Sequence, residues 1–365
     1  MPRPGNVSPA NAAVLDYSIS FTSTMSKDEP TPEMFFIVGR GRSGTDLLSS
    51  VLNAHPEISV APEALFVMNL FYTFHKIKDW NSKAKNKFTR YLWGETRLTK
   101  WWHLDKDKVV EDILAQNTKA SFAQLCRIPY MHYAVKHGKH PLLLGDKNPT
   151  YTLFVNEIHK IYPDARFVHV VRDYRDNVLS FKNVSFDLKN IYSLAQRWKR
   201  YNLVVKEFAD HHPDLVLTVR YEDLLGHPEE VLSKICQFLG VDYDAEVLNY
   251  YQQKSGGDIW QKHLSKPIDP DQRDKWQKQL KKRDIAKIEC ICSKLGKDYD
   301  YEPVHQSFPL SVKMLSLKGL LVGKAANFLE RNFFRLPCRV TEFLLKRYRR
   351  ATLTDTIRQQ RSNIS

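Results

Sequence analysis

The sequence predicts an α/β fold in which a three-layer parallel sheet is flanked by helices, carries a helical cap as an insertion and continues into a basic helical C-terminal tail. Two observations support this prediction. Short apolar runs typical of buried parallel strands recur between residues 34 and 220. Several of these runs end in glycine or polar residues and lead into a pattern typical of one face of a helix.

The first run, residues 34–38, leads into a glycine- and arginine-rich loop and then into a helical pattern that begins at Thr45. Gly39 and Gly44 have the separation of the nucleotide-triphosphate P-loop, but Thr45 stands where that loop has its lysine. Such a P-loop-like turn presents converging N–H groups and a helix N-terminus to an anion. The alternative is a surface turn with solvated arginines. The donors available for a phosphate or sulfate, without a metal, are Arg40, Arg42, Ser43 and Thr45.

The segment RSGTDLLSSVLNAHPEI, which begins at Arg42, resembles the 5′-phosphosulfate loop of sulfotransferases, whose donor is 3′-phosphoadenosine 5′-phosphosulfate (PAPS). It is most similar to the form found in tyrosylprotein sulfotransferases and bacterial relatives. The sequence departs from that form at Gly41, where the family has proline, and at Asp46, where the family has a hydroxyl residue. The negative charge of Asp46 argues against one of the family's donor contacts to the anion. The resemblance assigns the following residues to PAPS: Arg40, Gly41, Arg42, Ser43, Gly44, Thr45 and Asp46.

The second strand, near residues 58–60, ends just before Glu63. An acceptor hydroxyl must lose a proton, and a carboxylate or a histidine is the usual base. In the tyrosylprotein type a glutamate at the matching offset from the loop arginine is the base, and the resemblance carries this role to Glu63. A structural ion pair with Arg42 is the alternative for Glu63. The rival bases are His55, which suits a packing role better, and His103, His132, His137 and His140.

The third strand, residues 142–146, ends in Lys147 before a helix predicted from Thr150 to Ile161. It resembles the K-(D/N)-P element of sulfotransferases, whose lysine stabilises charge on the bridging oxygen as the sulfuryl group leaves. A cation aimed at that oxygen lowers the barrier, as in phosphoryl transfer. We therefore expect Lys147 to be catalytic together with Arg42; a solvated lysine is the alternative.

The fourth strand ends in Arg172, and Ser180 follows eight residues later in a helix that Asp173 can cap. Ligands bind at the carboxyl ends of strands in open α/β sheets, so Arg172 is placed to meet the same ligand as the first loop. The segment resembles the family's 3′-phosphate motif, which assigns the 3′-phosphate to Arg172 and Ser180. We expect Arg175 and Asp176 to form local ion pairs.

The fifth strand, residues 215–220, leads to Tyr221, which either approaches the nucleotide or packs under the sheet. The polar stretch 255–276 is similar to a sulfotransferase loop that closes on the nucleotide, with Ser265 and Lys266 as its contacts, or else is a mobile surface loop. A long charged helix is predicted from Asp269 to about Leu295.

Three parts of the chain are predicted around one catalytic domain of residues 31–304. Residues 1–30 are polar, lack a signal-peptide pattern and are expected to be disordered, with the natural start at either Met1 or Met25. Residues 75–140 form a helical cap whose aromatic residues either line an acceptor pocket or make a hydrophobic core. Residues 305–365 form a basic amphipathic extension.

Charge and cysteine content indicate in which compartment the protein works and what its tail contacts. The net charge is +14, and residues 311–365 contain twelve Lys or Arg and three acidic residues, so 12 − 3 = +9 lies in the tail. The tail either rests on an anionic membrane surface or packs on the core with a solvated basic face. The 5 cysteines show neither a disulfide framework nor a zinc pattern, which favours the cytoplasm.

The sequence thus resembles a PAPS-dependent O-sulfotransferase that moves a sulfuryl group to an acceptor hydroxyl, leaving a sulfate ester and 3′-phosphoadenosine 5′-phosphate. The acceptor is open, and an apolar or lipid-like hydroxyl compound would suit a membrane-associated tail. We expect no metal and no nucleic-acid partner. The alternatives are a nucleotide-dependent kinase, which the missing P-loop lysine disfavours, and an inactive nucleotide- or membrane-binding protein.

Overall fold

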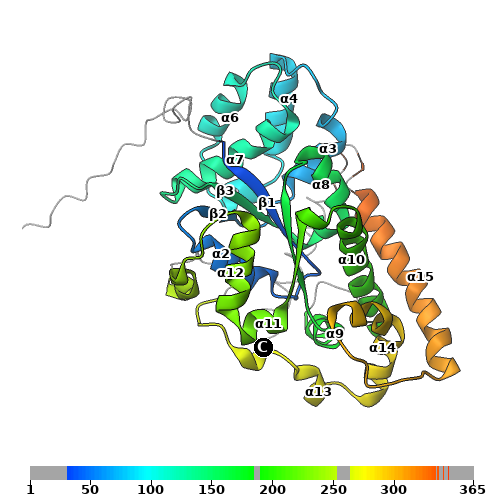
Figure 1. The fold of residues 1–365 in the computed structure, drawn as a ribbon. Helices are drawn as coiled ribbons and strands as arrows, with labels where there is room; N and C mark the ends of the chain where they lie inside the picture. The colour runs from blue at the N-terminus through cyan, green and yellow to red at the C-terminus, as the bar shows by residue number, and fades with distance from the viewer. Residues whose placement is uncertain are drawn as a thin grey trace, which may run out of the picture. The chain divides into compact units, whose positions relative to one another are not determined.

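A parallel five-stranded sheet organises the protein, as the computed structural model shows (Figure 1). The structure describes residues 31–184, 190–252, 264–333, 335, 336, 340 and 344. The predictions for residues 1–30, for most of the chain beyond residue 336 and for the first part of the 255–276 loop therefore fall outside the described residues. The strands are β1 (Glu33–Val38), β2 (Ile58–Ala61), β3 (Leu143–Lys147), β4 (Arg166–Val171) and β5 (Val216–Arg220).

The strand order is β2-β3-β1-β4-β5, and every neighbouring pair is parallel. All five predicted strands are therefore confirmed. In the register of the sheet, Ile37 lies between Lys147 of β3 and Val168 of β4. Because parallel strands end at the same edge, the loops that follow β1, β2, β3, β4 and β5 all meet at the carboxyl edge of the sheet.

Helices cover both faces of the sheet, which confirms the three-layer α/β prediction (Figure 1). Phe35 and Ile37 of β1 pack with α2 (Thr45–Asn53), α11 (Tyr221–Gly226) and α12 (Pro228–Leu239). Phe36 and Val38 alternate to the opposite face, as strand geometry requires. The helices that supply the core of that face include α3 (Phe66–Phe74), α7 (Phe122–Lys136), α8 (Val155–Ile161) and α10 (Ile191–His211).

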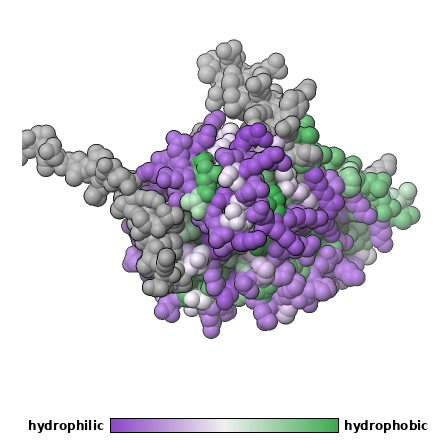
Figure 2. All heavy atoms as spheres, turned by 90° about the horizontal axis from the view of Figure 1, so that it is seen from above, coloured by the Kyte–Doolittle hydropathy of each residue, from purple (hydrophilic) through white to green (hydrophobic). Residues whose placement is uncertain are grey.

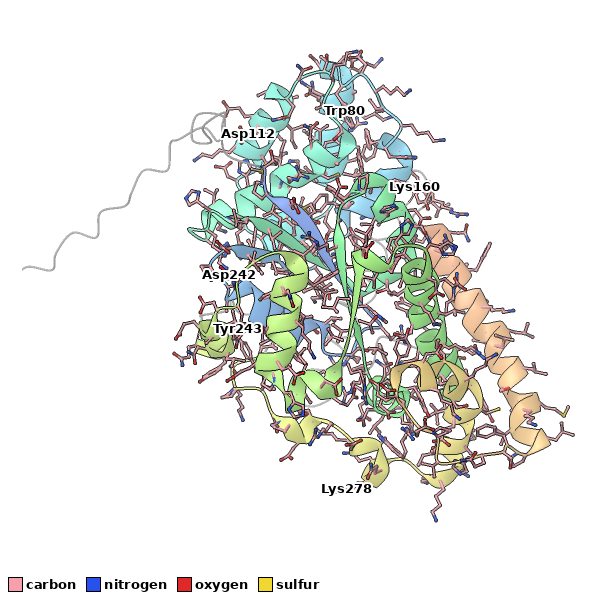
Figure 3. All side chains as sticks on the ribbon, viewed as in Figure 1. Trp80, Asp112, Lys160, Asp242, Tyr243 and Lys278 are labelled. Carbon is pink, nitrogen blue, oxygen red and sulfur yellow. The ribbon has the colours of Figure 1, made fainter. Side chains whose placement is uncertain are left out.

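The interval predicted as a cap is helical where the structure describes it. It contains α4 (Ser82–Leu92), α5 (Arg97–Lys100), α6 (Lys106–Ala115) and α7. Trp80, which Figure 3 places with Asp112 among these helices, is fully buried, as is Trp102. Both belong to the hydrophobic core that continues to the sheet, so for these two tryptophans the packing alternative is confirmed. The boundaries of a cap domain stay a prediction.

The long helix predicted from Asp269 to Leu295 is wrong in its continuity. The segment instead forms η5 (Pro270–Gln272), α13 (Lys275–Gln279) and α14 (Lys282–Gly296). Asp274 has a left-handed backbone, with φ 57, and Leu280 is extended, so the helix is interrupted at both residues. Likewise, the helix predicted from Thr150 begins as a 3₁₀ turn, η1 (Pro149–Phe154), before α8.

Five further helical elements lie in the described part of the chain. They are α9 (Tyr174–Lys182), η2 (Pro213–Leu215), η3 (Ala245–Gln252), η6 (Lys297–Tyr299) and α15 (Leu310–Phe333). The predicted end of α12 at Gly240 is confirmed, because Gly240 takes the left-handed conformation there. Among the described residues no helix combines the length and the apolar character needed to cross a bilayer.

Candidate active site

The loop after β1 is held in a conformation that requires glycine at two positions. Gly39 has φ +149, and a side chain there would lie 2.3 Å from the backbone oxygen of Val170. Gly44 has φ +95, and a side chain there would lie 2.2 Å from the ring of Tyr221. Arg42 also has a positive φ of 64, which is uncommon outside glycine. The backbone of the loop is therefore fixed by its sequence before any ligand binds.

Two side chains that the sequence reading missed hold this loop. The Oγ1 atom of Thr152 accepts a hydrogen bond from the Gly39 N–H at 2.8 Å and donates to the Gly39 carbonyl at 3.0 Å. The amide of Asn177 donates to the Gly41 carbonyl and to the Ser43 hydroxyl, both at 3.0 Å. Asn177 lies three residues before Ser180, so the helical spacing placed it on the same face of α9 and could have identified it.

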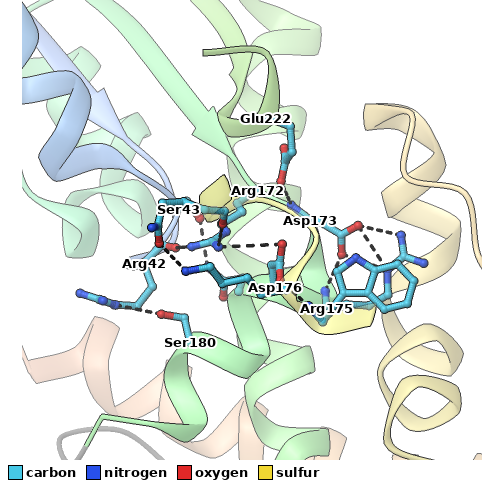
Figure 4. A network of polar contacts seen from close by, with 12 residues as sticks. Arg42, Ser43, Arg172, Asp173, Arg175, Asp176, Ser180 and Glu222 are labelled. Carbon is cyan, nitrogen blue, oxygen red and sulfur yellow. Dashed lines mark hydrogen bonds and ion pairs between the residues drawn. The ribbon is translucent and has the colours of Figure 1, made fainter. Parts of the chain in front are cut away.

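Arg42 and Ser180, predicted from separate motifs, meet in the structure (Figure 4). The Nε atom of Arg42 donates to the Ser180 hydroxyl at 3.1 Å. Asp173 caps α9 by accepting from the Arg175 N–H, as predicted. The loop after β1 and the helix after β4 therefore line one place at the carboxyl edge of the sheet.

Arg172 joins the same place from the end of β4 (Figure 4). Its guanidinium donates to the Arg42 carbonyl at 3.2 Å and to the Gln272 carbonyl at 2.9 Å, and it lies 4.6 Å above the ring of Tyr221. Its Nε atom is buried and has no hydrogen-bond partner. The nearby carboxylate of Asp176 is 3.9 Å away. Two backbone carbonyls, the Tyr221 ring and the long pair with Asp176 thus set the position of Arg172, and one buried donor is left for a ligand.

Arg175 and Asp176 behave as predicted. Arg175 forms ion pairs with Asp173 at 2.7 Å and with Glu289 at 3.1 Å. Asp176 accepts the Trp276 N–H at 2.9 Å as well as pairing with Arg172. These contacts tie α9 to α13 and α14, so both residues act in the scaffold of the site.

Tyr221 is buried and packs against Gly44 and Arg172, while its approach to the nucleotide stays a prediction. Ser265 and Lys266 are exposed, and the Lys266 carbonyl accepts from the Tyr250 hydroxyl at 2.7 Å. Gln272, in the same segment, contacts the site, because its carbonyl accepts a hydrogen bond from Arg172. Sequence reasoning did not single out Gln272.

Lys147 lies between two carboxylates at the carboxyl edge. Its Nζ atom donates to the Oε1 atom of Glu63 at 2.6 Å and also donates to Asp46. Its side chain is 8% exposed, so the alternative of a solvated lysine is wrong. Burial opposes the charge of Lys147, but Glu63 and Asp46 outweigh this effect and raise its pKa. The structure therefore gives Glu63 a partner, and that partner is Lys147.

Asp46, the unusual residue of the loop, belongs to this charged group. Partial loss of solvent would raise the pKa of this half-exposed carboxyl, yet the charges of Lys147 and Arg42 outweigh that effect and lower the pKa. Asp46 follows Thr45 in the first turn of α2, where a negative charge is favoured by the helix dipole. The Asp46 carboxylate thus lies where the resemblance places a hydrogen-bond donor to the phosphosulfate.

A buried carboxyl, Asp146, precedes Lys147 in β3. Asp146 accepts hydrogen bonds from the Tyr130 hydroxyl and the Asn148 amide. Burial raises the pKa of Asp146 to about 7. Sequence reasoning missed this group because Tyr130 lies on α7, in a stretch without a recognisable motif. The network links a helix of the cap interval to the strand end that carries Lys147.

The rival histidines make contacts of other kinds. His55 bonds to the Asp242 carbonyl at 2.8 Å and accepts from the Glu57 N–H, which fits the predicted packing role. His132 lies 2.7 Å from Asp112, and His137 bonds to the Tyr133 carbonyl at 2.8 Å. These bonds hold turns and helices of the fold together.

The arrangement fits an anion with two charged ends. Gly44 caps α2 without a side chain, so the first-turn N–H groups receive no side-chain acceptor and can face a ligand. Arg42 in the loop after β1, Arg172 at the end of β4 and Ser180 in α9 add side-chain donors. In the described part of the chain, no cluster of three His, Cys, Asp or Glu could hold a metal ion. The residues present therefore suit a nucleotide that carries phosphate and sulfate groups.

Comparison with known proteins agrees with this chemistry. A family model described as the Sulfotransferase family matches residues 32–245, which is more than half of the chain. Protein-tyrosine sulfotransferase 1 of Danio rerio is 25% identical over 300 residues, covering 78% of this chain and 77% of the relative. Protein-tyrosine sulfotransferase 1 of Homo sapiens is 25% identical over 312 residues, covering 81% of this chain and 77% of the relative.

A solved structure is similar in fold as well. The sulfotransferase domain from the Synechococcus PCC 7002 olefin synthase is 25% identical, with a TM-score of 0.54. The match covers 75% of this chain and 97% of that domain. The sheet and its flanking helices thus have a counterpart in a domain that carries this activity in its name.

Proposed function

This chain belongs to the sulfotransferase family and transfers a sulfuryl group from PAPS to an acceptor hydroxyl, and we propose that the acceptor is the phenol of a tyrosine in a polypeptide. The observation that carries the proposed mechanism is the contact of Lys147 with Glu63, at 2.6 Å, beside the anion loop. The proposed base and the proposed cation thus lie together, beside the loop that we propose holds the sulfuryl group.

We propose that Glu63 removes the proton of the acceptor hydroxyl. The oxygen freed of its proton attacks sulfur in line, and the bond between sulfur and the bridging oxygen of the donor breaks. Lys147 and Arg42 neutralise the charge that develops on the leaving 5′-phosphate, as cations do in phosphoryl transfer. PAPS supplies the sulfuryl group, and the products are a sulfate ester and 3′-phosphoadenosine 5′-phosphate.

The same proposal assigns the rest of the donor. The loop of residues 40–46 holds the 5′-phosphosulfate, with N–H groups at the start of α2 and the side chains of Arg42, Ser43 and Thr45. Arg172 and Ser180 hold the 3′-phosphate. Tyr221 supports Arg172 from below, and Ser265 and Lys266 lie on the segment expected to close over the nucleotide.

The proposed reaction also assigns a change of partners to Lys147. With Glu63 and Asp46 both in contact, the lysine has its single charge already matched by two carboxylates. Two of its three N–H donors are engaged, so it can face the leaving phosphate with the third or by giving up one carboxylate. We propose that it releases Asp46 and keeps Glu63, because Glu63 then remains oriented toward the acceptor.

The tyrosyl acceptor is supported by the named relatives, whose shared identity with this chain is about one residue in four. An apolar or lipid-like hydroxyl compound is the competing acceptor that the sequence left open. A kinase is not favoured, since Thr45 replaces the P-loop lysine and the family model is that of sulfotransferases. The family match likewise disfavours an inactive nucleotide- or membrane-binding protein.

The acceptor is tested by incubating the full chain with ³⁵S-labelled PAPS and a panel of acceptors. The panel contains tyrosyl peptides, the same peptides with phenylalanine in place of tyrosine, a sterol and a monosaccharide. We expect label on the tyrosyl peptides and none on their phenylalanine counterparts. Transfer to the sterol alone would reject the tyrosyl acceptor while leaving sulfuryl transfer in place.

We propose that the protein works in a reducing compartment, the cytoplasm. Cys126, Cys236 and Cys292 are buried free thiols, and Cys290 is free as well. Burial raises the pKa of Cys126 and of Cys292, which keeps both thiols protonated and inert. Alkylation of the native protein, followed by alkylation after unfolding, would count the thiols that are free in cells.

A further inference from the structure

Helix α15 presents its apolar side to solvent, which is the reverse of the usual arrangement for a helix packed on a protein surface. Five large apolar side chains recur at spacings of four, three, four and seven residues, so they lie along one side of a helix with about 3.6 residues per turn. We call this set the outer stripe. It consists of Leu310, Met314, Leu317, Leu321 and Phe328, exposed by 72%, 61%, 60%, 69% and 66%.

The opposite side of α15 is fixed to the protein. Gly319 is nine residues after Leu310, about two and a half turns, and therefore faces away from the outer stripe. It is buried so closely on α10 that a side chain would lie 2.1 Å from the Cβ atom of Tyr192. Gly323 packs one turn further along, where a side chain would lie 2.8 Å from Gln196. The glycines thus set which side of the helix points outward.

The C-terminal end of α15 is fixed as well. Arg331 pairs with Glu157 of α8 at 3.3 Å, and Phe333 packs against the core shared by the sheet and the cap interval. In Figure 1 the helix runs alongside α10 at the edge of the molecule. The outer stripe cannot turn inward without breaking these contacts.

The outer stripe lies in a basic setting. Residues 310–329 contain three lysines and no Asp or Glu, and residues 311–365 carry a net +9 from twelve cations and three acids. Lys313 and Lys324 are exposed beside the stripe. Figure 2 shows apolar surface along the same edge of the molecule. Apolar surface of this extent, bordered by charges of one sign, marks an interaction site.

We propose that the outer stripe of α15 docks on a membrane surface that contains anionic lipids, with the helix lying parallel to the bilayer. The positive charge beside the outer stripe favours a membrane with anionic lipids over a second copy of the chain. Anionic headgroups complement the lysines, and the apolar side chains enter the boundary of the acyl chains, as in interfacial helices. A second copy of this chain would instead bring two sets of lysines together, which like-charge repulsion opposes.

The test is co-sedimentation of the full chain with vesicles of phosphatidylcholine, either pure or mixed with phosphatidylserine. We expect binding to the mixed vesicles that weakens as salt is raised, because screening acts on the lysines. The double variant Leu317→Glu/Leu321→Glu should lower binding about tenfold or more, since it places two charges in the acyl boundary. Lys313→Glu/Lys324→Glu should lower binding to the mixed vesicles, with pure phosphatidylcholine little affected.

Leu142→Glu is the matched control, because Leu142 is 48% exposed and lies outside α15. It should bind vesicles as the unaltered protein does. Thermal unfolding of each variant verifies that the fold survives. Equal binding by the leucine double variant would overturn the proposal and assign the binding to the charges of the chain alone. A dimer in solution that this variant dissociates, without vesicle binding by the unaltered chain, would assign the outer stripe to a second copy.

Discussion

The two cations at the ends of the proposed donor site, Arg172 and Lys147, have different surroundings. At the end of β4, Arg172 is held by two backbone carbonyls and a tyrosine ring, its pair with Asp176 is long, at 3.9 Å, and its Nε has no partner. At the end of β3, Lys147 is held by Glu63 and Asp46. One cation is available to a ligand as it stands, and the other is already neutralised.

This difference indicates that one end of the site serves donor binding and the other serves the chemical step. The pair of Arg172 with Asp176 is long and the Nε of Arg172 has no partner, so Arg172 can bind a phosphate with little of the binding energy spent on rearrangement. A cation shared between carboxylates gains from the donor only when charge develops on the leaving phosphate, which is the condition for lowering a barrier. We therefore assign affinity for the donor to the Arg172 end and turnover to the Lys147 end.

Glu63→Gln should give the largest effect and act on the Lys147 end alone. Removing a general base should lower turnover by about 10²–10⁴-fold, since the amide cannot take the acceptor proton. Affinity for 3′-phosphoadenosine 5′-phosphate should be unchanged or higher, because a negative charge leaves the site. Single-turnover kinetics and calorimetry separate the two quantities. Glu57→Gln is the matched control, and near-normal turnover in Glu63→Gln would move the base to a histidine.

Asp146→Asn tests whether the Lys147 end rests on a protonated carboxyl. The pKa of Asp146 is raised from 3.8 to about 7, so between these values the folded protein holds a proton that the unfolded chain releases. The free energy of unfolding should therefore fall as pH rises through this range and stay flat above it. Between pH 5 and pH 8 the unaltered protein should lose ~3 kcal/mol relative to Asp146→Asn, measured by urea unfolding. A parallel pH dependence of the two proteins would contradict this.

The fold was predictable from sequence because every strand ends at a local signal. Gly39, Glu63, Lys147, Arg172 and Tyr221 each follow an apolar run, and all five runs are strands of the sheet. The strand order was not predictable, because no local pattern states which strands pair. The breaks at Asp274 and Leu280 were missed since neither residue type forbids a helix.

Part of the candidate site was likewise predictable from the sequence, and part was not. Arg42 and Ser180 were identified by motif, and the structure brings them within 3.1 Å. The two carboxylates on Lys147 were not foreseen together, because Asp46 and Glu63 come from different loops and meet Lys147 only in three dimensions. Gln272 was missed for a further reason: it contacts Arg172 through its backbone carbonyl, which carries no sequence signal.

Arg172→Ala acts on the other end of the donor. It should weaken binding of 3′-phosphoadenosine 5′-phosphate about 10–100-fold, because hydrogen bonds to a charged group are lost. Binding of adenosine 5′-phosphate, which lacks the 3′-phosphate, should change much less. Arg172→Lys should retain part of the affinity, and Arg283→Ala, at an exposed arginine of α14, is the control. Equal losses for both nucleotides in calorimetry would show that Arg172 only supports the loop.

Asp46→Asn should have the smallest effect, and it probes the residue that sets the two ends apart. In the proposed mechanism the carboxylate of Asp46 competes with the donor for Lys147 and lies near the phosphosulfate, so its removal should tighten donor binding. The side chain is 55% exposed, and solvent screens such charges, so the gain should be only about threefold to tenfold. The matched control Glu111→Gln changes the net charge equally on an exposed part of α6.

The direction of the change decides how Lys147 is used. Tighter donor binding in Asp46→Asn, with turnover lowered no more than the control, means that Lys147 leaves Asp46 when the donor arrives. Weaker donor binding would mean that Asp46 holds Lys147 in its working position, and that the lysine serves the donor while paired. In that case Lys147 and its carboxylates would contribute to donor affinity as well as to turnover. The contrast with Arg172 would then rest on Glu63 alone, as the base.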